Sequence, residues 1–198
     1  MSEPTRKRLV VGMAGASGAL YGIRLLQVLS RIPDCEVHLV MTNAAKLNVE
    51  VESELAVADV EALADVVHDV KAVSASIASG SFRTDGMIVV PCSMRTLSAI
   101  VTSFADNLLV RAADVTLKER RRLVVMPRET PLHVGHCRLL YEASQMGVVI
   151  CPPSPSFYGR PKTIDDLLDT AVGRVLDLFG IDAGIVKRWE GLPGPSGD

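Results

Sequence analysis

Aromatic side chains are scarce in this chain, which carries one Trp, three Tyr and four Phe among its 198 residues. A core this poor in rings must be built from Val, Leu, Ile and Ala, a composition typical of a parallel sheet covered by helices on both faces. Hydrophobic residues make up 48% of the chain. However, no uncharged apolar run approaches the roughly 18 residues of a membrane span. We therefore expect the excess of apolar side chains to be buried in the core or between subunits.

A dominant charge is also lacking, since 21 Lys and Arg stand against 23 Asp and Glu, for a formal net charge of −2. This balance gives no general support for nucleic acid or an anionic membrane as a partner. The first residues lack an apolar segment of signal-peptide length. No metal-finger spacing connects the cysteines, which are Cys35, Cys92, Cys137 and Cys151. We expect reduced thiols and a cytoplasmic protein.

Five short apolar runs are each too short for a helix and are predicted to be buried strands. They are Leu9–Ala14, Val37–Met41, Met87–Pro91, Leu123–Met126 and Val148–Cys151. Helical patterns separate them, over Gly18–Arg31 and Asp106–Arg122, and the Thr163-x-x-Asp166 spacing resembles a capping box that opens another helix. This alternation predicts an α/β fold with a doubly wound parallel sheet.

The chain shows no internal linker, so we expect a single domain over residues 1–190. The segment Asn48–Ser81 is less clearly organised, and we expect one or two helices there before a loop at Ser79–Ser81. The Gly-rich and Pro-rich residues 191–198 are predicted to be a disordered tail.

Ligands of open α/β sheets bind beyond the carboxyl ends of the strands. Most hydroxyls and glycines outside the predicted helices follow a predicted strand, in the segments Gly15–Gly18, Thr42–Asn43, Cys92–Thr96, Arg128–Thr130 and Pro152–Tyr158. Two absences narrow the ligand class. The glycines miss the G-x-G-x-x-G spacing and no acid follows the second predicted strand, which argues against NAD. A G-K-[ST] motif is also missing, which argues against a nucleoside triphosphate.

Two of these segments open helices. The Gly15–Gly18 turn feeds a helix whose free N–H groups favour a phosphate, and Ser93-x-x-Thr96 places two hydroxyls at the start of another. Two such helix starts on neighbouring strands suit a mononucleotide better than a dinucleotide. Ordinary explanations stay open, namely a tight packing turn for the first and a simple N-cap for the second.

Several charged side chains have both a structural and a functional explanation. Arg111 and Lys118 share one stripe of a predicted helix, which by default is a solvated face. Arg174 lies at the edge of a buried stripe and needs an anionic partner, either a carboxylate or a phosphate. Glu129 is a candidate proton shuttle, unless it forms a structural ion pair with Arg128. His133 and His136 are three residues apart, but no further ligand cluster accompanies them, and we expect no metal.

Five motifs, in order and with natural spacing, strongly resemble the UbiX-type flavin prenyltransferases, a family that includes the small subunit of bacterial phenolic-acid decarboxylase systems. They are Gly15–Gly18, Pro91–Leu97, Arg111–Arg121, Arg128–Leu132 and Pro155–Tyr158. The resemblance runs from about Leu9 to Trp189. It implies a flavodoxin-like Rossmann fold of three αβα layers that binds FMN and acts without a metal.

The resemblance also implies the reaction and its setting. The dimethylallyl group of dimethylallyl phosphate would be joined to N5 and C6 of reduced FMN. The prenylated FMN would serve a UbiD-type aromatic acid decarboxylase, in ubiquinone biosynthesis or in aromatic degradation. Members of the family usually assemble as homo-oligomers, most often dodecamers with sites between subunits.

Site residues follow from the same resemblance, motif by motif. Residues implied to hold FMN are Gly15, Ala16, Ser17, Thr42, Ser93, Met94, Arg95, Thr96 and Arg128. Residues implied for the prenyl phosphate side are Arg111, Lys118, Tyr158, Arg174 and Trp189, and a neighbouring protomer is a possible source of Lys118. The implied catalytic residues are Ser17, Glu129 and Glu52, the last reaching in from another protomer. Two positions depart from the family pattern. Asn43 stands where relatives often have Lys, and Arg95 where they often have Lys or Gly.

Two other functions stay open. One is an FMN-dependent decarboxylase related to the cysteine decarboxylases, which would leave the basic prenyl-phosphate residues unexplained. The other is a non-catalytic subunit that binds a decarboxylase.

Overall fold

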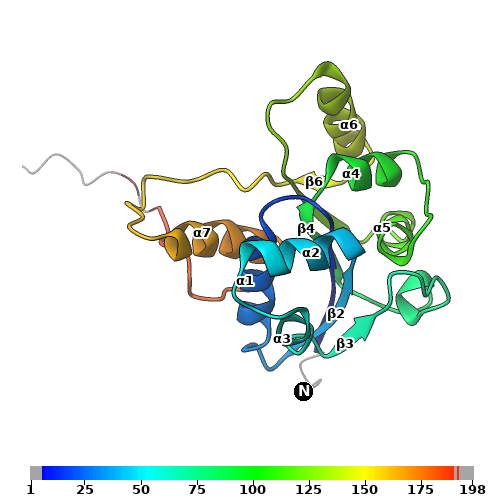
Figure 1. Cartoon of the computed structure of the whole chain (residues 1–198), viewed down its shortest axis with the longest axis horizontal. Helices are drawn as coiled ribbons and strands as arrows, with labels where there is room; N and C mark the ends of the chain where they lie inside the picture. Colours follow the sequence, from blue (N-terminus) through cyan, green and yellow to red (C-terminus); the bar gives the residue numbers. More distant parts are fainter. Residues whose placement is uncertain (1–5, 190, 192–198) are drawn as a thin grey trace, which may run out of the picture.

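The protein is described by a computed structural model that covers residues 6–189 and 191. The tail expected over 191–198 therefore lies outside the described residues, apart from Gly191. A parallel sheet of six strands forms the centre, in the order β3-β2-β1-β4-β5-β6 (Figure 1). The strands are β1 Lys7–Met13, β2 Cys35–Met41, β3 Val66–His68, β4 Gly86–Cys92, β5 Arg122–Pro127 and β6 Val149–Ile150. The expected doubly wound parallel sheet is confirmed.

Helices cover both faces of this sheet. One face packs against α1 (Ala19–Leu29), α2 (Asn43–Glu52), α3 (Val57–Glu61) and α7 (Ile164–Asp177). The other packs against the 3₁₀ helix η1 (Ser76–Ala78), α4 (Met94–Val101), α5 (Leu108–Lys118) and α6 (Val134–Gln145). Successive residues of β1 point to opposite faces, so Leu9 and Val11 join the first core and Val10 the second. The result is the three-layer αβα architecture.

Two expectations from the sequence were wrong. Strand β3 was missed, because it pairs with β2 for only three residues at the edge of the sheet and exposes Val66 and Val67, so it leaves no buried apolar run. The helix expected over Asp106–Arg122 is shorter. Asn107 caps it by accepting from the amide of Val110 at 3.1 Å, and Arg120, with φ +57°, ends it before β5.

Other local expectations hold. Thr163 and Asp166 form the capping box of α7. The Asp166 amide donates to the Thr163 hydroxyl at 3.1 Å, and the Thr163 amide donates to the Asp166 carboxylate at 3.0 Å. The segment before Ser81 contains the end of α2 and all of α3. Among the described residues, no helix has the length and apolarity needed to cross a membrane.

A partly buried polar network ties the amino half of β2 to its neighbours. Arg8 on β1 binds the Glu36 carboxylate through two nitrogens, at 2.9 and 3.0 Å, and the Nε2 atom of His38 lies 2.7 Å from the same carboxylate. His38 is 3% exposed, and its Nδ1 atom lies 2.9 Å from Nε2 of His68 on β3. The Arg8 guanidinium, helped by His38, lowers the pKa of Glu36 from 4.5 to about 2.

This network predicts how stability depends on pH. Because the pKa of Glu36 is lower in the folded state, its contribution to the free energy of unfolding is complete above about pH 4.5 and is lost as the pH falls toward about 2. We expect Glu36→Gln to destabilise the protein at pH 6, with the gap to wild type narrowing at pH 3. Urea unfolding of both proteins, with Glu54→Gln as a control of equal charge change, measures this. A gap that does not vary with pH would contradict the assignment.

Candidate functional site

The carboxyl ends of four adjacent strands are held together at one rim of the sheet. Three backbone hydrogen bonds join them: Ala14 to Pro91 at 3.0 Å, Thr42 to Met13 at 3.0 Å and Arg128 to Cys92 at 3.1 Å. The strand order reverses between β1 and β4, and such a switch point is where open α/β sheets bind ligands. The segments Gly15–Gly18 and Ser93–Thr96 therefore lie at the expected ligand position, with Thr42 and Arg128 on either side.

The turn after β1 depends on two glycines. Gly18 has φ +104°, a backbone conformation that side chains disfavour, and it directly precedes α1. Gly15 lies so close to α2 that an added Cβ would stand 2.3 Å from the Cβ of Ala44. The turn therefore approaches the start of α2 as closely as the backbone permits.

One face of α2 makes three contacts with this turn. Ala44, Asn48 and Glu52 are spaced four residues apart, so they share a helix face. Ala44 packs against Gly15, the Asn48 amide donates to the carbonyl of Ala16 at 2.7 Å, and Glu52 accepts from two amides at the start of α1. Sequence reasoning missed Asn48, although its spacing from Glu52 within a helix was a usable signal.

Glu52 contacts the start of α1 in its own chain. Its Oε2 atom accepts from the amides of Gly18 and Ala19, each at 2.8 Å, within the same chain. These amides are among those that α1 leaves without an intrahelical partner, and a carboxylate is favoured there by the helix dipole. Glu52 therefore lies beside the Ser17 turn of its own chain.

The hydroxyls at the starts of α2 and α4 act as N-caps. Thr42 accepts from the amide of Ala45 at 3.1 Å, and Ser93 accepts from the amide of Thr96 at 3.2 Å. Ser93 and Thr96 also bond through their hydroxyls at 3.0 Å, and Thr96 is buried. Ser93 therefore caps α4, and its contact with a ligand stays a prediction. The first amides of both helices still point at the rim, as helix N-termini do.

Exposed polar groups complete the rim. Ser17 is exposed on the turn, and Glu129 is exposed after β5, where it accepts from the amide of Thr130 at 3.0 Å. Arg128 and Glu129 do not pair with each other, so the structural ion pair that was considered for them is not formed. Neither Arg95 nor Arg128 belongs to any ion pair within the described part of the chain. Two guanidinium groups are thus available to an anionic ligand at this rim.

The residues proposed for the prenyl phosphate fall into two groups. Arg111 and Lys118 lie on α5, where Arg111 pairs with Asp114 at 2.8 Å and Lys118 with Glu119 at 2.7 Å. Arg174 lies on α7 and is exposed, although the sequence placed it at the edge of a buried stripe. Its anionic partner is the Asp177 carboxylate, at 2.6 Å.

The second group also contains two rings. Tyr158 and Trp189 meet edge to face, with ring centroids 5.6 Å apart and an angle of 76° between the rings. Both are more than half exposed. Because α5 and α7 cover opposite faces of the sheet (Figure 1), one chain does not bring the two groups together.

Neither thiols nor a histidine cluster adds reactive groups at the rim. Burial raises the pKa of the Cys92 thiol, next to Ser93, to about 12, so it stays protonated and unreactive. His133 caps α6 by accepting from the amide of Gly135 at 3.0 Å, and its ring packs on His136. Across residues 6–189, His, Cys, Asp and Glu form no group of three or more that could hold a metal ion.

The close approach of the turn to α2 predicts a rescue experiment. Gly15→Ala places its Cβ against Ala44, so we expect the turn to shift and the affinity for FMN to fall at least about tenfold. Adding Ala44→Gly removes the atom that clashes, leaving only contacts of 3.4 Å or more, and should restore most of the affinity despite a helix cost of about 1 kcal/mol. Flavin fluorescence titration of the three proteins measures this. Equal losses in the single and double variants would refute the contact.

Comparison with known proteins adds three findings. The Flavoprotein family profile matches residues 1–176. The flavin prenyltransferase UbiX of Escherichia coli K12 is 54% identical over 187 residues, which are 93% of this chain and 99% of that protein. UbiX of Thauera aromatica is 55% identical over 184 residues, 93% and 94% of the two chains.

Solved structures agree with this fold. AnUbiX (PadA1), in complex with FMN and dimethylallyl pyrophosphate, superposes with a TM-score of 0.93 at 50% identity, covering 95% of this chain and 100% of that one. A dodecameric FMN-dependent UbiX-like decarboxylase from Escherichia coli O157:H7 gives a TM-score of 0.92 at 50% identity, with coverage of 93% and 100%. The chain therefore belongs to the UbiX family of flavin prenyltransferases.

Proposed function

We propose that this chain joins the dimethylallyl group of dimethylallyl phosphate to N5 and C6 of reduced FMN. The observation that carries the proposal is the rim between β1 and β4, where α2 fixes the Ser17 turn in a chain that is 54% identical to a flavin prenyltransferase. Amides at helix starts, exposed hydroxyls and two free guanidinium groups suit a flavin with one phosphate.

FMN would be held by residues of the four strand ends. These are Gly15, Ala16 and Ser17 after β1, Thr42 after β2, Ser93 to Thr96 after β4 and Arg128 after β5. The family relationship carries these assignments, and the backbone bonds that join the strand ends support them. The bound reduced flavin would supply the nucleophilic N5 and C6 atoms.

The prenyl phosphate would be held by Arg111, Lys118, Tyr158, Arg174 and Trp189. Since α5 and α7 cover opposite faces of the sheet, we infer that different subunits supply the two groups. Large apolar side chains exposed on this chain support assembly, among them Val134 at 85%, Phe157 at 70% and Ile164 at 68%. By analogy with the dodecameric relative, we propose a dodecamer.

The chain's own residues would then perform three tasks. The cations and the Tyr158 hydroxyl stabilise the negative charge that develops on the phosphate as the allylic C–O bond breaks. Glu129 lies exposed at the rim, where it can protonate the phosphate or accept the C6 proton. Ser17 and Glu52 lie together at the turn and would assist at the flavin.

The product would serve a UbiD-type decarboxylase. We also place the protein in the cytoplasm, a proposal supported by its four unpaired cysteines.

The reaction is tested directly with purified protein, reduced FMN and dimethylallyl phosphate under anaerobic conditions. We expect a flavin heavier by one prenyl unit by mass spectrometry. We expect Glu129→Gln to keep FMN bound while slowing product formation by about 100-fold, and Glu50→Gln, an exposed acid on α2, to behave as wild type.

Other outcomes separate the alternatives. Loss of FMN in Glu129→Gln would make that acid structural. Decarboxylation of a substrate by this chain with oxidised FMN, without prenylated product, would favour the FMN-dependent decarboxylase. Stable binding to a decarboxylase without any flavin turnover would favour a non-catalytic subunit.

A further inference from the structure

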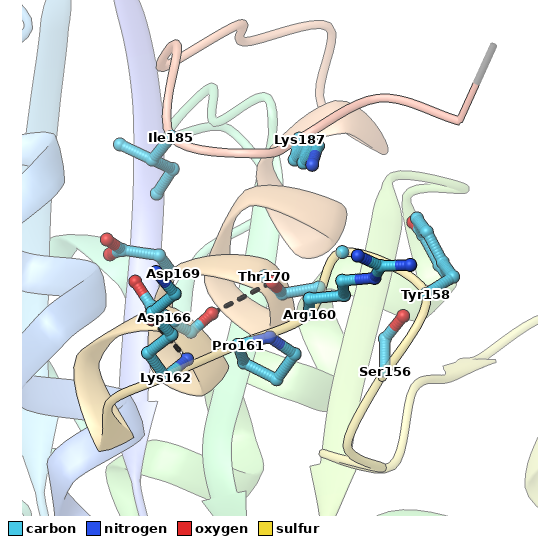
Figure 2. Close-up of a pocket in the computed structure, with 11 residues that line it drawn as sticks. Ser156, Tyr158, Arg160, Pro161, Lys162, Asp166, Asp169, Thr170, Ile185 and Lys187 are labelled. Carbon is cyan, nitrogen blue, oxygen red and sulfur yellow. Dashed lines mark hydrogen bonds between the residues drawn. The ribbon is translucent and has the colours of Figure 1, made fainter.

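A polar hollow of about 210 Å³ lies beside Tyr158 and away from the strand ends. Three segments enclose it: the chain over 156–162, the first turns of α7, and the chain over 185–187 that follows α7 (Figure 2). Tyr158 belongs both to this lining and to the residues proposed for the prenyl phosphate. A ligand in the hollow would therefore share a contact with the substrate site.

Positive charge gathers around this hollow. Arg160, Lys162 and Lys187 line it, and Figure 2 shows the Arg160 guanidinium extended toward Tyr158. None of these three side chains takes part in an ion pair between described residues, whereas Arg111, Lys118 and Arg174 all do.

Neither acid of the lining forms an ion pair with these cations. Asp166 is committed to the start of α7, where it accepts from the amides of Lys162 and Thr163 at 2.7 and 3.0 Å. Those amide bonds lower the pKa of Asp166, so it remains a carboxylate that serves the helix. Asp169 binds Arg24 of α1 through both oxygens, at 2.6 and 2.9 Å. Both carboxylates are thus satisfied by other partners.

Hydrogen-bond donors suited to an oxyanion also face the hollow. The hydroxyls of Ser156 and Tyr158 line it and make no side-chain hydrogen bond to another described residue. The Thr170 hydroxyl donates to the Asp166 carbonyl at 2.8 Å and so is not available as a donor. Arg160 is held at φ +53°, an uncommon conformation for a side-chain-bearing residue that is often found at ligand sites.

We propose that this hollow binds a phosphate group next to Tyr158. Three cations that form no ion pair between described residues and two hydroxyls supply the positive charge and the donors that phosphate oxygens need, and guanidinium binds such oxygens with two parallel bonds. The proposal rests on the proposed function, which brings two sources of such a group to Tyr158. One is the terminal phosphate of a dimethylallyl pyrophosphate, and the other is the inorganic phosphate that the transfer releases.

Binding is tested without turnover, by calorimetric titration of the FMN-loaded protein with inorganic phosphate and with inorganic pyrophosphate. We expect the Arg160→Gln/Lys187→Gln double variant to bind at least one of the two anions about tenfold or more weakly than wild type. The control is Lys71→Gln, an exposed lysine after β3 that should bind both as wild type does. Equal affinities of the double variant and wild type for both anions would overturn the proposal.

Turnover then separates the two sources. If the terminal phosphate occupies the hollow, the double variant loses about tenfold in kcat/KM with dimethylallyl pyrophosphate and stays within about twofold with the monophosphate. If released phosphate occupies it, inorganic phosphate inhibits wild-type turnover of the monophosphate, and the inhibition constant rises about tenfold in the double variant. Unchanged kinetics in both arms would contradict the proposal. If the wild-type protein makes no prenylated FMN, the proposed function is contradicted instead. The anion titrations do not depend on turnover, so the two failures can be told apart.

Discussion

The packing of one face of α2 against the turn after β1 is the contact on which the candidate site depends. Gly15 touches Ala44, Asn48 holds the carbonyl of Ala16, and Glu52 takes the amides that open α1. These contacts hold the backbone on both sides of Ser17 against α2. A turn that moved freely would leave the flavin-binding residues without a common frame.

The doubly wound topology supports the proposal that more than one chain contributes to the site. The strand order brings the flavin-binding segments to one rim, but it sends α5 and α7 to opposite faces of the sheet. We therefore propose that the cations on these two helices meet across a subunit boundary. The apolar excess of the composition agrees with this proposal, since side chains such as Val134 and Phe157 are exposed on the single chain.

Much of this could be predicted from the sequence, because buried parallel strands leave continuous apolar runs and polar residues follow where those runs end. Strand β3 could not, since two of its three residues face solvent at the sheet edge. The family motifs predicted the site residues, but a motif does not show which partner a side chain binds. Thus the motifs did not show that Glu52 caps α1 of its own chain, where free amides attract it. Asn48 lies outside every motif and emerged only from the contact with Ala16.

Subunit mixing tests the central claim, a transferase site divided between chains, most directly. Lys118→Ala and Arg174→Ala are each expected to be nearly inactive as homo-oligomers, because each removes one cation from every site. Co-assembled in equal amounts, they should regain about a quarter of wild-type prenyl transfer, since one site in four receives an intact α5 from one protomer and an intact α7 from another. Mixed assemblies as inactive as the separate variants would contradict the shared site.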